Sequence, residues 1–291
     1  MTIDDALAQF LLQLEADGRS PHTTGQYQRH VRAFTAWWAQ GGHADDVAAI
    51  GPRDVAQFFA GTGARERCNG GTKRPTSLNA MRTSLRVFFC WLRDAGLVAE
   101  NPARLLRRAR CSPPPPRGLH ADEQQRLLGA LATATGPEAE RDRMLFTLLL
   151  RSGLRVGSAV GLDVEDLDLD HGEVHVRSAK GGRPNRTMVP VEVGAALKSW
   201  VGERTTGPVF LAKGRRISTR HVQRRFAAWL ERAGVERKAS PHSLRHSFAT
   251  LMLERTGNLE LVRRALNHAS IASTVIYVGH DDRALREAVG A

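Results

Sequence analysis

The sequence predicts a mostly α-helical protein of two domains, with one small β-hairpin or sheet in the second domain. Apolar residues recur at helical spacing through most of the 291 residues. Two alternating segments, "GEVHVRS" and "RTMVPV", flank the turn-rich "AKGGRPN", which is typical of a hairpin. The segment "RRARCSPPPPRG" at 107–118 carries four consecutive prolines, which form a stiff spacer that cannot continue a helix. We therefore place the linker between the domains there, and the chain is long enough to bury two cores.

The N-terminal domain, residues 1–106, is expected to be all-helical, with helices that begin at about residues 3, 21, 52 and 78. The first helix follows a capping pair, Thr2 and Asp5. The second follows Ser20 as its N-cap, with a proline in the first turn. Tyr27 lies on the apolar stripe of this second helix, so we expect it in the core.

The second domain, residues 119–291, is expected to be helical apart from its hairpin. Helices are predicted at about 121–133, 138–151, 192–202, 218–233, 241–256, 258–267 and 270–278. In the hairpin, Val174 and Val176 alternate with polar residues and are expected on one buried face.

The charge of the chain favours a polyanionic partner. Lys and Arg outnumber Asp and Glu by 42 to 30, which gives a net charge of +12 at pH 7. Both domains carry this excess and the cations cluster, so nucleic acid explains the bias better than general solubility does. A solvated surface is the alternative for each cluster. The candidate phosphate contacts are Arg104, Arg107, Arg108, Arg183, Arg220, Arg224 and Arg225, the last three on a helix with a basic outer face.

Other classes of protein are disfavoured. Cys68, Cys90 and Cys111 are widely spaced, so neither a disulfide framework nor a zinc site is expected, and a reducing cytosol fits best. The longest apolar run, "MLFTLLL", is too short to span a bilayer, and the acidic N-terminus lacks the basic region of a signal peptide. We expect a cytoplasmic protein that does not contact a membrane.

Five short motifs in the second domain carry groups that can act on a phosphodiester. They are "SGLR" with Arg155, "AKGGR" with Lys180, "HSLRH" with His242 and Arg245, "LNHAS" with His268, and "STVIY" with Tyr277. Each alone has a simple structural explanation, such as a helix cap, a solvated turn or a loop histidine. Their combination and order indicate one shared site.

With these motifs the second domain resembles the tyrosine recombinase (phage integrase) family, including its Xer-like two-domain members. The family's "TGLR", "HxLRH" and "LGHxS" boxes stand here as "SGLR", "HSLRH" and "LNHAS", and Tyr277 follows His268 at the family's usual interval. The segments "SPHTTGQYQRHVRAFTAWW" and "FFCWLRDAGLVAENPA" resemble the N-terminal core-binding domain more weakly. The resemblance implies a two-domain clamp around duplex DNA.

The activity that the resemblance implies is site-specific recombination without metal, ATP or any other cofactor. The phenolate of Tyr277 would attack a DNA phosphodiester, forming a 3′-phosphotyrosyl link and freeing a 5′-hydroxyl; the reverse step rejoins strands. A phenol with a pKa of about 10 is ionised to roughly one part in a thousand at pH 7. It therefore needs a base and a positive field.

The family's other motif residues would supply both. His242 is our candidate for the base. Arg155 and Arg245 would bind the phosphate oxygens and stabilise charge that grows during the reaction. Lys180 would protonate the leaving 5′-oxygen, and His268 would hydrogen-bond a phosphate oxygen.

Three alternatives remain open. Ser158 stands where the family usually carries an acidic residue, so a catalytically weakened homologue with an architectural or regulatory role is the first. A metal hydrolase is the second, because His242 and His246 lie one helical turn apart, although no third ligand is placed to complete the site. A type IB topoisomerase, which uses a similar set of residues, is the third; the Xer-like layout favours recombination.

The residues after Tyr277 are expected to form a short helix with a narrow apolar stripe that includes Leu285 and Val289. This helix could fold back on its own domain. The resemblance favours packing against a neighbouring protomer instead, closing a homotetramer on two paired DNA sites within the nucleoid. No motif encodes the target sequence or distinguishes chromosome dimer resolution, element integration and transposon resolution.

Overall fold

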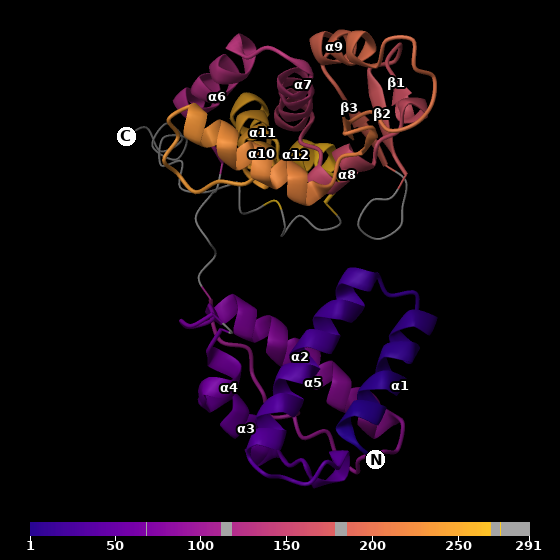
Figure 1. Cartoon of the computed structure of the whole chain (residues 1–291), viewed down its shortest axis with the longest axis vertical. Helices are drawn as coiled ribbons and strands as arrows, with labels where there is room; N and C mark the ends of the chain where they lie inside the picture. Colours follow the sequence, from indigo (N-terminus) through magenta and orange to yellow (C-terminus); the bar gives the residue numbers. More distant parts are fainter. Residues whose placement is uncertain (68, 112–117, 178–184, 269–273, 275–291) are drawn as a thin grey trace. The chain divides into compact units, whose positions relative to one another are not determined.

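The computed structural model describes residues 1–67, 69–111, 118–177, 185–268 and 274. The chain divides into two compact units, Met1–Ser112 and Pro113–Ala291, each with its own hydrophobic core (Figure 1). The mostly helical, two-domain fold predicted from the sequence is confirmed. Across the described ranges, no helix combines the length and the apolar character that crossing a membrane requires.

The first unit is built from helices. They are α1 (Ile3–Ala16), α2 (Pro21–Gln40), α3 (Pro52–Ala60), α4 (Thr62–Arg65) and α5 (Pro75–Asp94), with a 3-10 turn η1 (Val47–Ala49). The predicted caps are present, because the hydroxyl of Thr2 accepts from the backbone N–H of Asp5 at 3.1 Å and that of Ser20 from Thr23 at 3.3 Å. The single-turn elements α4 and η1 were not predicted, since one turn has no apolar period to detect.

Aromatic rings fill the core of the first unit. The fully buried ones are Phe10, Phe34, Phe58, Phe88 and Phe89. Tyr27 on α2 is half-buried and packs edge-on against Phe10, with ring centroids 5.6 Å apart. The prediction that Tyr27 belongs to the core is confirmed.

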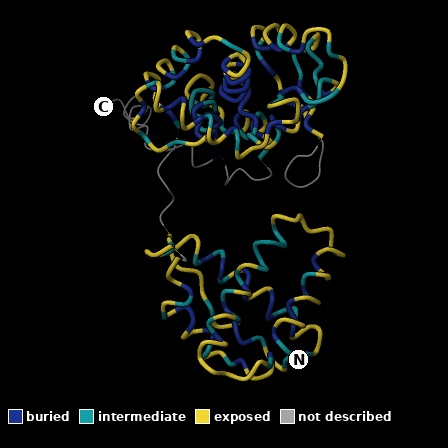
Figure 2. Tube along the Cα trace, in the orientation of Figure 1, coloured by how far each residue is buried: buried dark blue, intermediate teal, exposed yellow. Residues whose placement is uncertain are grey.

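The second unit surrounds α7. Its helices are α6 (Ala121–Thr133), α7 (Pro137–Ser152), α8 (Val156–Gly161), α9 (Val191–Val201), α10 (Thr219–Arg232), α11 (Pro241–Thr256) and α12 (Leu259–Ala265), with a 3-10 turn η2 (Val164–Asp166). Helix α7 packs against α6, α9 and α11 and is buried over most of its length (Figure 2). The helix predicted at 270–278 lies outside the described residues, except for Thr274.

A small antiparallel sheet lies at one end of the second unit (Figure 1). Its strands are β1 (Leu167–Asp168), β2 (Glu173–Val176) and β3 (Asn185–Met188), and a separate pair joins β4 (Leu211–Ala212) to β5 (Arg215–Arg216). Strand β2 pairs with both neighbours, with Val174 opposite Thr187. Val174 and Val176 are buried, as their alternation predicted. The two-residue strands β1, β4 and β5 were not predicted.

A buried carboxylate joins α7 to α10. One oxygen of Asp142 accepts from Nε and Nη2 of Arg141 at 3.0 and 2.7 Å. The other accepts from Nε of Arg225 at 2.6 Å and Nε1 of Trp229 at 2.8 Å. The side chains of Asp142 and Arg141 are only 1% and 4% exposed. The carboxylate of Asp142 and the guanidinium of Arg141 are therefore both shielded from water, and each is stabilised by the charge of the other.

We expect Asp142→Asn to lower the free energy of unfolding by about 3–5 kcal/mol, because it leaves the buried guanidinium of Arg141 without a counter-ion. Urea unfolding followed by circular dichroism measures this loss. The matched control is Asp122→Asn, since Asp122 forms an exposed ion pair with Arg126 at 3.1 Å on α6; it should change stability by no more than about 1 kcal/mol. Equal effects of the two substitutions would contradict the account.

Candidate active site

Arg245 lies at the centre of the site, on the first turns of α11. It is 3% exposed. Its Nη1 donates to the carbonyl of Gly153 at 2.6 Å and its Nη2 to the carbonyl of Leu266 at 2.6 Å. These bonds tie α11 to the end of α7 and the end of α12. The guanidinium is thereby fixed in orientation by backbone groups from two other segments.

Gly153 makes this close approach possible. It ends α7 with a left-handed φ of 65°. A Cβ atom at this position would lie 2.4 Å from Cδ1 of Phe248 on α11. Any other residue would therefore strain the backbone and displace the carbonyl that Arg245 binds.

Arg155 borders the same small cavity as Arg245, although 90 residues separate them in sequence. Arg155 is the N-cap residue of α8 and follows directly on the turn at Gly153. The cavity has a volume of about 10 Å³, and Ser158 and Thr187 also line it. The position that is usually acidic in the family is therefore beside both arginines, and serine contributes no carboxylate there.

Three histidines lie near this centre. His242 and His246 lie one turn apart on α11, with ring centroids 4.8 Å apart and planes at 86°. His268, which follows α12, shares a 2.9 Å hydrogen bond between its Nδ1 and Oγ1 of Thr274. Thr274 is fully buried, so it fixes one edge of the imidazole.

The environment of His268 keeps its imidazole neutral. Burial and then the positive charges of Arg245 and Arg155, with smaller effects from His242 and His246, lower the pKa of His268 to about 4. The other four side chains are thus close enough to His268 to affect its charge electrostatically. A neutral ring can hydrogen-bond an anion held by the two arginines without being repelled by them.

A pH titration tests this. The folded-state pKa of His268 is below the ordinary value of 6.5, so the unfolded chain binds the proton first. The stability contributed by neutral His268 is complete above pH 6.5 and is lost as the pH falls from 6.5 towards 4. In NMR spectra the His268 ring signals should move by no more than about a tenth of the full protonation shift between pH 8 and pH 5. The exposed His171, whose pKa is raised by its hydrogen bond with Asp168, should titrate above 6.5. A midpoint for His268 at 6 or higher would contradict the buried cationic environment.

Comparison with known proteins decides the family. The sequence profile of the phage integrase family matches residues 117–284, and that of the phage integrase N-terminal SAM-like domain matches residues 7–96. The chain belongs to the phage integrase family. This family consists of tyrosine-type site-specific recombinases, so the predicted family and enzyme class are confirmed.

Individual relatives agree over nearly the whole chain. Tyrosine recombinase XerC of Chromobacterium violaceum is 31% identical over 284 residues, covering 96% of this chain and 91% of the relative. XerC of Salmonella typhi is 34% identical over 286 residues, covering 94% and 91%. The fold matches the post-cleavage structure of the XerH recombinase bound to its palindromic difH substrate, with a TM-score of 0.74, 21% identity and coverage of 96% and 84%. It also matches the Tn1549 transposon integrase in complex with a circular intermediate DNA, with a TM-score of 0.75, 17% identity and full coverage of both chains.

Three predicted residues of this phage integrase family member, Lys180, Arg183 and Tyr277, lie outside the described residues. Of the described residues next to them in sequence, Val176 on β2 and Thr187 on β3 line the cavity beside Arg155.

The predicted phosphate contacts differ in their surroundings. Arg107, Arg108, Arg220 and Arg224 are exposed, and Arg104 is exposed but paired with Glu100 at 2.9 Å. Arg225 is half-buried on α10, where it bonds the buried Asp142 and pairs with Glu138 at 3.4 Å. These bonds give Arg225 a structural role, and its contact with DNA stays a prediction.

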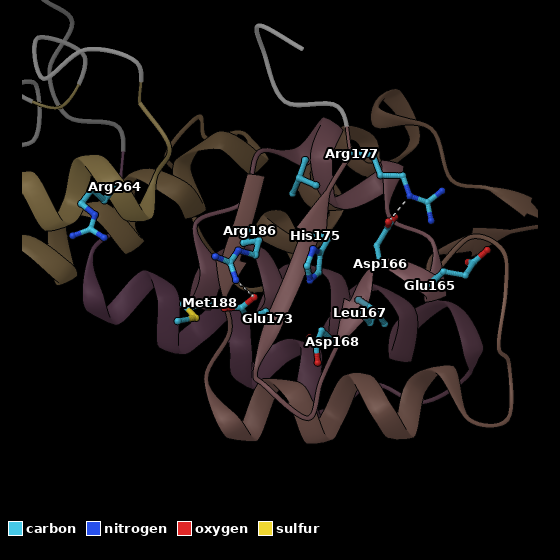
Figure 3. A pocket seen from close by; sticks show the side chains of 11 residues that line it. Glu165, Asp166, Leu167, Asp168, Glu173, His175, Arg177, Arg186, Met188 and Arg264 are labelled. Atoms are coloured by element: carbon cyan, nitrogen blue, oxygen red, sulfur yellow. Dashed lines mark hydrogen bonds and ion pairs between the residues drawn. The ribbon is translucent and has the colours of Figure 1, made fainter. Parts of the chain in front are cut away.

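A larger hollow of about 1090 Å³ lies against the outer face of the β1–β3 sheet (Figure 3). It contains none of the predicted catalytic residues. Its charges are largely paired, with Arg177 bound to Asp166 and Arg186 to Glu173. Among the predicted catalytic residues, Arg155 and Arg245 border the small cavity instead of this hollow. Within the described ranges, no group of three or more His, Cys, Asp or Glu side chains could hold a metal ion.

Proposed function

We propose that this phage integrase family member cuts and rejoins duplex DNA at specific sites through a covalent bond to Tyr277. The observation that carries the proposal is the convergence of the buried Arg245 with the half-buried Arg155 and His268 on one cationic centre. A phosphodiester is an anion, and its charge grows at the non-bridging oxygens as the nucleophile attacks. Preoriented guanidinium groups stabilise that charge most strongly where water is excluded. A DNA substrate of this kind would place the protein on the nucleoid in the cytoplasm.

The reaction is a transesterification. The phenol oxygen of Tyr277 forms a bond to phosphorus as the bond from phosphorus to the 5′-oxygen breaks. His242 takes the phenol proton, and Lys180 gives a proton to the departing 5′-oxygen. A 5′-hydroxyl from the partner strand then reverses these steps, so the phosphodiester is restored without an external energy source. The arginines and the lysine supply the positive charge that a metal ion provides in other phosphoryl-transfer sites.

A non-catalytic homologue is the alternative that Ser158 raised. Serine at this position removes a carboxylate from beside Arg155 and Arg245. The loss leaves the phosphate-binding centre more positive and removes a group that could orient the arginines. Because backbone carbonyls already orient Arg245, we favour an active enzyme.

We further propose that the tail after Tyr277 packs against a neighbouring protomer, and that four protomers assemble on two paired DNA sites. Head-to-tail contacts of this kind close into rings. A tail that begins beside the nucleophile would couple assembly to cleavage.

Deletion of residues 280–291 should change binding to a single site by less than about threefold and reduce recombination of paired sites at least about 100-fold. Gel-shift titration and a plasmid recombination assay measure the two quantities. Leu285→Ser should reproduce the loss, since Leu285 lies on the apolar stripe, whereas Arg286→Ser on the polar side should not. Full recombination by the truncated protein would show that the tail only caps its own domain.

A further inference from the structure

A buried amide at the end of the first unit holds the chain segment that leads into the prolines. Asn79 on α5 is 4% exposed. Its Nδ2 donates to the carbonyl of Ala109 at 2.9 Å, and its Oδ1 accepts from the backbone N–H of Ala109 at 2.9 Å. One side chain thus pairs with both backbone groups of a residue 30 positions later, as a neighbouring strand would. Nη1 of Arg82 adds a 3.1 Å bond to the same Oδ1.

This pairing fixes the backbone of residues 107–111, which we call the basic segment. The sequence alone assigns these residues to the linker between the domains. In the structure, the bonds from Asn79 to Ala109, and a 3.3 Å contact from its Nδ2 to Sγ of Cys111, attach them to α5. At the other end of the prolines, Leu119 is held separately within the second unit, where its N–H donates to Oγ of Ser247 at 2.8 Å.

The basic segment presents three cations on this fixed backbone. Arg107, Arg108 and Arg110 are all exposed. In the described part of the chain none of them forms an ion pair, whereas the neighbouring Arg104 is paired with Glu100. Three exposed guanidinium groups within four residues, with no acidic partner there, fit a polyanion with closely spaced charges.

We propose that Asn79 is a positioning residue that preforms the basic segment as a contact surface for the DNA phosphate backbone. This inference rests on the proposed DNA substrate. A segment already fixed in its binding conformation loses little conformational freedom when it binds. Without Asn79 the same arginines would be present, but the segment would have to be ordered at the moment of binding.

The first arm of the test does not involve DNA. Trypsin cleaves after arginine, and a fixed backbone resists cleavage. In the full-length protein, Asn79→Ala should increase the rate of cleavage after Arg108 and Arg110 at least about tenfold. Ser247→Ala, which releases the other end of the prolines, should leave these rates unchanged. If Asn79→Ala impairs folding, Asn79→Asp replaces it, because aspartate keeps the acceptor for Ala109 and replaces the donating amide with a second, negatively charged acceptor. Unchanged cleavage in a folded Asn79 variant would overturn the proposal.

The second arm measures binding to a random-sequence duplex over a range of salt concentrations. Replacing Arg107, Arg108 and Arg110 together by alanine should reduce the magnitude of the log–log salt slope by up to about 2.7, at about 0.9 per phosphate contact. Asn79→Ala should weaken binding about tenfold when the arginines are present and less than about twofold when they are absent. An unchanged slope, or an equal loss in both backgrounds, would overturn the inference but leave the proposed function intact. Failure of the wild-type protein to bind any duplex would refute the proposed function instead. The trypsin experiment would still show whether Asn79 fixes the basic segment.

Discussion

Replacement of Arg245 by lysine is expected to slow DNA cleavage by about 10²–10³-fold. Lysine keeps the charge but cannot bind the carbonyls of Gly153 and Leu266 at once while it faces a phosphate, because it lacks the planar fork of arginine. The expected loss is that of one fixed donor to the oxygens on which charge develops. The loss is measured as the rate of covalent complex formation at saturating protein concentration. The substrate is a DNA site that the protein has selected by binding from a pool of random duplexes.

The matched control is Arg255→Lys. Arg255 lies near the end of the same helix and is exposed, so this substitution should change the cleavage rate less than about twofold. Circular dichroism and duplex binding must remain near wild type in Arg245→Lys, since the residue also joins three segments of the fold. A folded Arg245→Lys protein that cleaves at the wild-type rate would exclude Arg245 from the phosphate site.

Replacement of Tyr277 by phenylalanine should have the largest effect, because it removes the atom that forms the bond to phosphorus. Neighbouring groups can raise the fraction of phenolate or stabilise the transition state, but none can substitute for the missing oxygen. Binding to DNA should persist within about twofold, since one hydroxyl contributes little beside many phosphate contacts. The separation of binding from cleavage distinguishes this substitution from one that unfolds the protein.

Local signals in the sequence were sufficient for the longer elements of the fold. The caps at Thr2 and Ser20 determine where α1 and α2 begin, and the alternation around Val174 identifies β2. Such signals act within one turn or one strand. Helices of at most six residues, such as α8, and two-residue strands, such as β4, are too short to show a period and depend on the surrounding tertiary structure.

The residue types of the site could be predicted from the sequence, but the backbone groups that orient them could not. The motif order grouped Arg155, Arg245 and His268, and the structure brings these three together. The backbone carbonyls that orient Arg245 could not be predicted, because a carbonyl has no residue-specific signal and its position depends on how α7 and α12 end.

Arg225 and Asn79 illustrate the same limit. The sequence alone predicts Arg225 on the basic outer face of α10, because nothing in that helix indicates the buried Asp142 on α7 that Arg225 binds. Asn79 likewise pairs with the backbone of Ala109, 30 residues away, and an asparagine within a helix gives no sequence signal of such a partner. Long-range polar pairs of this kind become visible only once the helices are packed.

The most direct test of the central claim is covalent capture on a nicked half-site duplex in the presence of excess EDTA. The nick allows the short strand with its 5′-hydroxyl to diffuse away, so a phosphotyrosyl bond accumulates and is seen as a shifted band in denaturing gels. Wild-type protein and Tyr27→Phe should both give the adduct, since Tyr27 is a core residue packed against Phe10. Tyr277→Phe should bind the duplex and give none. A covalent adduct of undiminished yield in Tyr277→Phe would contradict the assignment of Tyr277 as the nucleophile.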